Sequence, residues 1–352
     1  MRKLALLSVL AGAGALLIVA VTAGAARHHR LTGTSGTVWV VERFDGGPNT
    51  LAAFDAATGD VLAVVPVGRR PIGVTAPRGT GKVYTADERS NQLTVVAKRD
   101  LSTTHIATGP LPHHVMASPN GKQVYVGEYG TNKVGVVDTA TDTLAAEWKA
   151  SANPLAKTHA VWITNDGKDL YATNENVPQA ATGTLSKLDA RTGERVWEVE
   201  IGSRPSEVLV TPNGKTAYVT VRNDNKVRVF DVSGESPVPL GETFIGVQPD
   251  TMQMTNDGTT LVVGLRSIPQ MALMDTDTLA VRTVTFPGYG ISGHEWLSAN
   301  GKTTFIALES LDPGRPGAVG VVDNTSGEII DTWAYPGGPW PHGIFFEPRV
   351  LP

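Results

Sequence analysis

The chain has 352 residues, of which 18% are charged and 6% aromatic, with 38 Gly, 23 Pro and a formal net charge of −4. It contains no cysteine, which excludes thiolate catalysis, cysteine-ligated metal, disulfides and a lipid-modified cysteine. No basic run occurs beyond the N-terminus, so a nucleic-acid partner is not expected.

Residues 1–26 predict a secretory signal. Arg2 and Lys3 precede an apolar run over residues 4–21, and Ala23-Gly24-Ala25 has the small-residue pattern of a cleavage site. The alternative is an uncleaved anchor, because a helix of that run would be about 27 Å long, nearly enough to cross a bilayer. We predict a secreted or extracytoplasmic protein that contacts a membrane only through this segment, if it is retained. Residues 27–36 form a polar lead-in.

Residues 37–348 repeat one pattern seven times: an apolar strand, an Asn-Gly or Asp-Gly turn, a second strand that usually contains Tyr, and a third strand that ends in Asp. Such turns between alternating strands are strong hairpin signals. The period matches a four-stranded propeller blade. We predict an all-β fold, a seven-bladed β-propeller of four-stranded blades. The plainest turn glycines, spaced 43 to 47 residues apart, are Gly121, Gly167, Gly214, Gly258 and Gly301.

The two ends of the repeat region predict how the ring closes. Residues 37–41 have the sequence of a second strand, and the missing first strand appears at residues 341–346. The C-terminal strand therefore completes the first blade, which removes a free sheet edge that would invite aggregation. The first strands, in chain order, begin near Pro71, Pro112, Thr158, Pro205, Pro249, Ser292 and Pro341.

Three second strands carry a more specific signature, each after an Asn-Gly or Asp-Gly turn and before a strand ending in Asp. They are Tyr218-Val219-Thr220, Tyr171-Ala172-Thr173-Asn174 and Tyr125-Val126-Gly127. This signature resembles the repeat of the YVTN family of β-propellers, and the similarity extends over residues 37–348. It departs at residues 78–81, which carry an extra residue, and at residues 261–264, which lack the Tyr. The resemblance implies the propeller fold and an extracytoplasmic setting.

Histidines gather at one place in the repeat. Eight residues before the turn glycine, or at the equivalent place near the C-terminus, stand His113, His159, Ser206, Asp250, Gly293 and His342. The following position holds His114, Glu207 and His294, and Glu295 comes next. Five of the eight histidines thus occupy two adjacent positions of the repeat. The first strand of a blade lines the channel, so we expect these side chains to converge at one channel mouth.

A second set of polar side chains stands eight residues after the turn glycine or at the equivalent place. Its members are Arg43, Glu88, Tyr129, Glu175, Arg222, Arg266 and Glu309. The second strand runs antiparallel to the first, so its end lies beside the start of the first strand. Both sets therefore line the same mouth.

Three interpretations of this mouth remain open. Convergent neutral imidazoles suit a transition metal such as copper, zinc or iron, with His113, His114, His159, His294 and His342 as candidate ligands. A metal-free site would bind a small polar or anionic ligand through Arg222, Arg266, Glu88, Glu175, Glu309 and Asp250. A purely structural network would solvate the channel mouth, with the blade rims left to contact a protein partner. We predict a monomer that binds a metal ion or a small ligand at this mouth.

An enzymatic alternative uses the same residues. An ion on the histidines, with Glu207 or Glu295 as proton acceptor and Arg222 and Arg266 on an anionic substrate, would make a metal-dependent oxidoreductase or lyase. Serine-hydrolase, zincin and nucleotide-binding motifs are absent from the sequence. Trp162 and Trp296 follow the histidines closely and are interpreted either as channel packing or as an aromatic wall beside the site.

Overall fold

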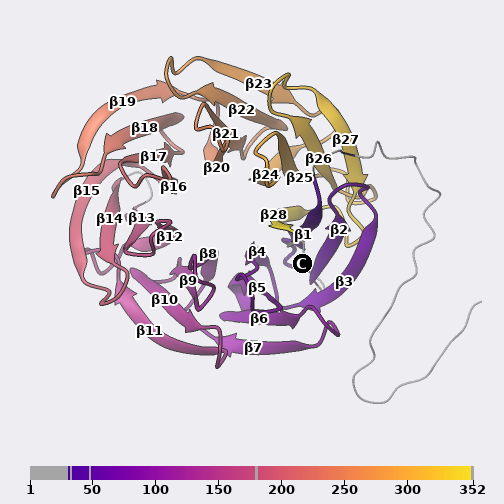
Figure 1. The fold of residues 1–352 in the computed structure, drawn as a ribbon, viewed down its shortest axis with the longest axis horizontal. Helices are drawn as coiled ribbons and strands as arrows, with labels where there is room; N and C mark the ends of the chain where they lie inside the picture. Colours follow the sequence, from indigo (N-terminus) through magenta and orange to yellow (C-terminus); the bar gives the residue numbers. More distant parts are fainter. Residues whose placement is uncertain (1–30, 32–33, 47–48, 179–180, 350–352) are drawn as a thin grey trace, which may run out of the picture.

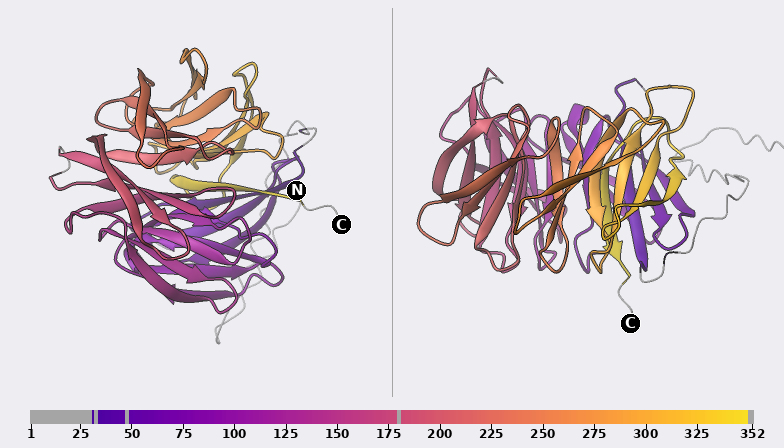
Figure 2. Two further views of the ribbon diagram at one scale, coloured as in Figure 1. Left: turned by 60° about the vertical axis from the view of Figure 1, so that its left-hand side comes forward. Right: turned by 90° about the horizontal axis from the view of Figure 1, so that it is seen from above.

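The computed structural model describes residues 31, 34–46, 49–178 and 181–349. The expected signal over residues 1–26 lies outside the described residues, as does most of the polar lead-in. Over the described residues the chain forms seven four-stranded antiparallel sheets arranged in a ring (Figure 1). The predicted seven-bladed propeller is therefore confirmed. Figure 2 shows the ring edge-on as a disc, with the blades side by side.

Each blade runs from an innermost first strand to an outer fourth strand, and the bounds follow in that order. Blade one is β28 (Pro341–Pro348), β1 (Gly36–Glu42), β2 (Asn49–Asp55) and β3 (Val61–Val67); blade two is β4 (Pro71–Thr75), β5 (Lys82–Asp87), β6 (Gln92–Ala97) and β7 (Thr103–Ala107), with the 3-10 helix η1 (Glu88–Ser90) after β5. Blade three is β8 (Pro112–Ala117), β9 (Gln123–Glu128), β10 (Lys133–Asp138) and β11 (Thr143–Lys149); blade four is β12 (Lys157–Ile163), β13 (Asp169–Glu175), β14 (Thr182–Asp189) and β15 (Arg195–Ser203).

Blade five is β16 (Pro205–Val210), β17 (Thr216–Val221), β18 (Lys226–Asp231) and β19 (Val238–Phe244); blade six is β20 (Pro249–Met254), β21 (Thr260–Leu265), β22 (Gln270–Asp275) and β23 (Val281–Thr285). Blade seven is β24 (Ile291–Leu297), β25 (Thr303–Glu309), β26 (Ala318–Asp323) and β27 (Ile329–Ala334). Among the residues that the structure describes, no helix is long and apolar enough to cross a bilayer.

Blade one is built from both ends of the ring, as predicted. Strand β28 pairs antiparallel with β1, with Val38 opposite Phe346 and Val40 opposite Ile344. Apolar side chains fill the space between neighbouring sheets. Val134 of blade three, for example, packs in one cluster with Val161 and Leu170 of blade four. Each sheet buries its face on the next, so the closed ring covers faces that an open row would leave exposed.

Every first strand has a β-bulge just after its start. In blade four the register shifts between Thr158 and Val161, and the other blades shift at the equivalent place. Successive side chains of a regular strand point to opposite faces, whereas a bulge re-aims them. The rings of the consecutive residues His113 and His114 therefore stack, with centroids 4.9 Å apart. The bulge explains how two adjacent positions of the repeat both serve the channel.

A Thr near the end of the second strand stabilises the bulge and makes a hydrogen bond to the next blade. The Thr220 hydroxyl accepts a hydrogen bond from the Glu207 amide at 2.8 Å and donates to the Asp250 carbonyl of blade six at 2.6 Å. Thr173 makes the same pair of contacts in blade four. Gly127 stands at this position in blade three, where a Cβ would lie 2.7 Å from the His159 carbonyl oxygen. The position therefore sets how closely adjacent first strands approach.

Three buried carboxyls lie at the ends of the second strands of blades one, two and three. Asp87 accepts a hydrogen bond from the Gly68 amide at 3.1 Å, and Glu128 accepts one from the Gly109 amide at 3.0 Å. Burial raises the pKa of Glu42 and of Glu128 to about 7, and that of Asp87 to about 6. Each carboxyl thus binds its proton more tightly in the folded chain than in the unfolded chain.

This difference predicts a pH-dependent effect of Glu42→Gln. The stability that Glu42 contributes is present below pH 4.5 and is lost as the pH rises through about 7, whereas an amide does not titrate. The variant should therefore gain roughly 1–2 kcal/mol of unfolding free energy relative to wild type between pH 5 and pH 8. Urea denaturation at both pH values measures this gain. Glu235→Gln, in an exposed turn, is the matched control. A pH-independent difference for Glu42→Gln would contradict the assignment.

Candidate functional site

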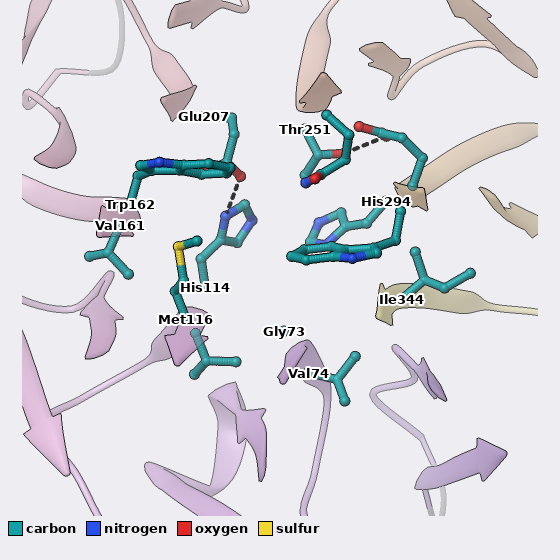
Figure 3. Close-up of a pocket in the computed structure, with 14 residues that line it drawn as sticks. Gly73, Val74, His114, Met116, Val161, Trp162, Glu207, Thr251, His294 and Ile344 are labelled. Atoms are coloured by element: carbon teal, nitrogen blue, oxygen red, sulfur yellow. Dashed lines mark hydrogen bonds and ion pairs between the residues drawn. The ribbon is translucent and has the colours of Figure 1, made fainter. Parts of the chain in front are cut away.

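The first strands of four blades bring the five predicted histidines into one cluster. Their rings contact one another in a continuous series along the channel. The centroid distances are 4.4 Å for His113–His159, 4.9 Å for His113–His114 and His114–His159, 4.8 Å for His114–His294, and 4.5 Å for His294–His342. Figure 3 shows two members, His114 and His294, on facing sides of the channel. The repeat alignment thus predicted their convergence correctly.

Two of the histidines are held on both ring nitrogens. His159 Nδ1 lies 3.0 Å from the carbonyl oxygen of Ser206, to which it donates, so its Nε2 accepts a hydrogen bond from Arg222 at 3.0 Å. His342 Nδ1 donates to Glu309 at 2.9 Å, and its Nε2 accepts from Arg266 at 3.2 Å. Both imidazoles are therefore neutral with a defined tautomer.

Asp250 lies between Arg222 and Arg266 and so connects the His159–Arg222 pair with the His342–Arg266 pair. It pairs with Arg222 and, at 3.0 Å, with Arg266, and it accepts a further hydrogen bond from the Ser206 hydroxyl. Asp250 is only 1% exposed. Burial opposes its ionisation, but the two guanidinium charges outweigh burial and hold its pKa well below the usual range. The predicted residues Asp250, Arg222 and Arg266 thus form a buried ion cluster.

Most of the remaining members of the charged ring pair between blades, and Arg70 and Glu88 pair within blade two. Glu175 accepts a hydrogen bond from the Tyr129 hydroxyl at 2.7 Å and lies 3.7 Å from Arg222. The other ring pairs are Arg204–Glu175 at 3.5 Å, Arg43–Glu309 at 3.5 Å and Arg70–Glu88 at 3.0 Å. Arg222 is 3% exposed, whereas the Arg266 side chain is 21% exposed. Of the two arginines predicted to bind an anion, Arg266 is therefore the more accessible.

Two arginines of this ring were missed from the sequence. Arg70 and Arg204 each stand directly before the proline that begins a first strand, and both have a positive φ, 51° and 58°. That unusual backbone turns the residue before the strand toward the mouth, where it meets the carboxylates of the ring. The residue before the strand-starting proline was the sequence signal that could have identified them.

Three imidazole nitrogens lack a hydrogen-bond partner within the described part of the chain. They are His113 Nδ1, His114 Nε2 and His294 Nε2, and all three are buried. His114 Nδ1 lies 2.9 Å from Glu207, which orients its ring. Burial holds the pKa of His113, His159 and His294 well below the usual range, so these rings are neutral at physiological pH. Neutral imidazoles with free lone pairs are potential metal ligands.

A geometric trio stands out within the cluster. His113, His114 and His159 each offer a ligand atom, and these atoms lie within 4.8 Å of one another. His294 and His342, also predicted as ligands, continue the series of rings on the far side of His114. The structure therefore divides the five predicted ligands into a compact trio and a flanking pair.

A cavity of about 50 Å³ lies beside the cluster, further along the first strands. Its polar lining residues include His114, Glu207, Thr251, Gln253, His294 and Glu295. The Thr251 hydroxyl donates to one oxygen of Glu295 at 2.7 Å. Burial raises the pKa of Glu295 well above the usual range, so this carboxyl is protonated at neutral pH. Glu207 and Glu295, the two predicted proton-transfer residues, thus line one space.

Residues 79–279 match the model of a family described as "Lactonase, 7-bladed beta-propeller". The chain belongs to this family. No curated protein matches its sequence. The fold of this family member is similar to that of the periplasmic gluconolactonase of Pseudomonas aeruginosa, with a TM-score of 0.66 and 18% identity over 88% of this chain and 98% of the other.

Two further solved structures are similar. One is a putative 6-phosphogluconolactonase of Bacteroides uniformis, with a TM-score of 0.66 and 17% identity over 89% of this chain and 100% of the other. The other is a hypothetical selenium-binding protein of Sulfolobus tokodaii, with a TM-score of 0.71 and 10% identity over 90% of this chain and 96% of the other. At these identities the likeness establishes the fold of this lactonase-family member and leaves its chemistry to its own side chains.

The ion cluster predicts a large effect of Asp250→Asn. The variant leaves Arg222 and Arg266 with too little negative charge around them, and breaking a buried pair in this way typically costs about 3–5 kcal/mol. The control is Glu242→Gln on the outer strand β19, where Glu242 pairs with Lys226 and Arg228 in an exposed setting. Exposed pairs contribute about 0–1 kcal/mol. Chemical denaturation of both variants measures the difference, and equal losses would contradict a buried ion cluster.

Proposed function

We propose that this lactonase-family propeller binds a transition-metal ion through His113, His114 and His159. The observation that carries the proposal is the compact trio, whose ligand atoms lie within 4.8 Å of one another. Imidazole nitrogens around a tetrahedral ion at 2.0–2.1 Å would be about 3.4 Å apart. Closing the trio around an ion would therefore need its ligand atoms to approach one another by up to about 1.5 Å.

The surroundings of the trio support this proposal. His113 Nδ1 and His114 Nε2 have no other partner in the described residues, and Glu207 orients His114 from behind, as carboxylates commonly do for metal-bound imidazoles. His159 Nε2 now accepts from Arg222, so this hydrogen bond would have to open. Arg222 would keep Asp250 and Glu175 as partners, and their negative charges would offset its repulsion of a cation.

The available ligand atoms limit which metal ions the site would bind. With no cysteine in the chain and three imidazoles in the trio, the site suits copper, zinc or iron better than calcium or magnesium. Three protein ligands leave a coordination position open for a substrate, where a bound ion would supply Lewis-acid or redox chemistry. Glu207 and Glu295 would accept or donate protons on the cavity side. A metal-dependent oxidoreductase or lyase would need these residues in these roles.

A second candidate function is lactone hydrolysis, which the family description and the two gluconolactonases suggest. The supporting observation is the partly exposed pair Arg43 and Arg266 at the mouth, with side chains 18% and 21% exposed. These guanidiniums would hold a phosphate or carboxylate group of a sugar acid. His342 beside Arg266 would act as a base toward water once its hydrogen bond from Arg266 opens.

We also propose that the protein is exported, which the N-terminal charge, apolar run and small-residue site of residues 1–26 support. The remaining alternative is a scaffold that contacts a protein through its blade rims. That function would leave the channel histidines free of metal and would not depend on them.

Metal binding predicts a stoichiometric ion in the wild-type protein. The protein should be purified without a chelating tag, supplemented with copper, zinc or iron, dialysed and analysed by mass spectrometry. We expect about one ion per chain, and a loss of at least tenfold in the double variant His113→Ala/His114→Ala. His105→Ala, on the exposed strand β7, is the control and should retain the ion. Absence of metal from the supplemented wild type, or its retention in the double variant, would overturn the proposal.

Lactone hydrolysis predicts turnover above the spontaneous rate. Gluconolactone and 6-phosphogluconolactone should be followed by acid release in a pH-stat. We expect at least a tenfold acceleration for the phosphorylated lactone, reduced about tenfold by Arg266→Gln through a higher KM. Arg89→Gln, an exposed arginine, serves as the control. If neither lactone is hydrolysed faster than in buffer, lactone hydrolysis is excluded for these two substrates and the candidate fails.

A further inference from the structure

The cavity beside the cluster is separated from the charged mouth. The ion cluster of Asp250, Arg222 and Arg266 does not contribute to its lining. First strands begin at that mouth, and the cavity-lining side chains stand later on the same strands, as Trp162 does on β12. The buried ion pairs therefore lie between the cavity and the mouth. A molecule in the cavity would be screened from the mouth by them.

Three buried polar atoms of the lining have no partner among the described residues. They are Glu295 Oε1, His114 Nε2 and His294 Nε2. Glu295 is 1% exposed, and Thr251 occupies only its other oxygen. Leaving a buried polar atom without a hydrogen bond typically costs about 1–3 kcal/mol. The residues that carry these atoms all line one small cavity, so a modest side-chain movement would present the atoms to a bound molecule or water.

Glu295 also departs from the rest of the repeat. It pairs with Ile306 just after the bulge, and the equivalent residues of five other blades are Val74, Val115, Val161, Val208 and Met252. An apolar residue suits this buried position, so a carboxyl there costs stability. A loss of stability confined to one blade is expected where the unusual residue binds a ligand.

The opposite side of the cavity is mainly apolar, with Gln253 as a polar member. Met116, Trp162, Trp296 and Ile344 line it, and the first three are partly exposed, unlike the buried His114 and His294. Figure 3 shows Trp162 and Met116 beside the His114–Glu207 pair. Partial exposure at this level indicates that solvent reaches the cavity from the face opposite the charged ring.

We propose that this cavity binds a small neutral molecule with one polar group and a short apolar part, which enters from the face opposite the charged ring. The polar group meets Glu295 and His294, and the apolar part packs on Trp162 and Trp296. An ion would lose its hydration in this largely buried space, where Glu207 already contacts His114 and Glu295 contacts Thr251, so a neutral molecule is favoured. A cavity of about 50 Å³ admits only a few heavy atoms. The inference shares His114 with the proposed metal trio but does not require the ion.

Fluorine NMR of protein labelled with 5-fluorotryptophan tests this site. Trp162→Phe and Trp296→Phe assign the two cavity signals among the seven tryptophans. Three probes of equal chain length are titrated: 1-propanol, propionate and propylammonium. Each titration uses chelator-treated protein and metal-supplemented protein, so that failure of the metal site is distinguished from failure of the cavity site.

We expect 1-propanol to shift the Trp162 and Trp296 signals in a saturable way in both preparations, with at least tenfold weaker effects from the two ions. Glu295→Met, which introduces the residue of blade six, should weaken propanol binding at least tenfold. His105→Ala should not. No saturable shift, equal shifts by the charged probes, or a shift only in metal-supplemented protein would each overturn the proposal. If Glu295→Met does not fold, the selectivity of the wild type among the three probes decides.

Discussion

The β-bulge at the start of each first strand is the constraint on which the site depends. A regular strand would send every second side chain away from the channel. The bulge turns two consecutive positions inward, and the Thr220 and Thr173 hydroxyls hold it by bridging to the next blade. The same hydroxyl thus shapes the channel wall and sets the spacing of neighbouring blades. A change in the packing between blades would therefore also move the side chains of the site.

Electrostatics then divides the channel into two layers. Near the mouth, Asp250 and the carboxylates of the ring balance five arginines, which allows charges to remain buried without isolation. One step further in, His294 is neutral and Glu295 holds its proton, so this layer carries less charge than the mouth. A neutral molecule loses less hydration than an ion on entry into this layer. The charged mouth therefore favours ionic ligands, and the cavity behind it favours neutral ones.

Much of this was predictable because a repeat serves as a coordinate system. Alignment on the turn glycines placed His113, His159 and His342 around one axis and assigned β28 to blade one, and the structure confirms both. What the repeat could not supply is the lateral partner of each side chain. The contact of Arg222 with His159 joins two adjacent blades and depends on side-chain direction. The approach of Arg70 to Glu88 within blade two depends on the backbone before the first strand. Such contacts follow from rotamers and loop backbone, which the period does not encode.

The places where a repeat disagrees with itself carry more functional information than those where it agrees. The first-strand residue directly after the bulge is a packing Val in four blades and Met252 in a fifth. Packing therefore does not explain the Glu295 of blade seven at this position. His113, His159 and His342 fill a neighbouring position, where the other blades carry Ile72, Ser206, Asp250 and Gly293. A closed ring tolerates such variation because each blade is stabilised mainly by its neighbours. The energetic cost of the buried Glu295 carboxyl becomes affordable where a ligand satisfies its free oxygen.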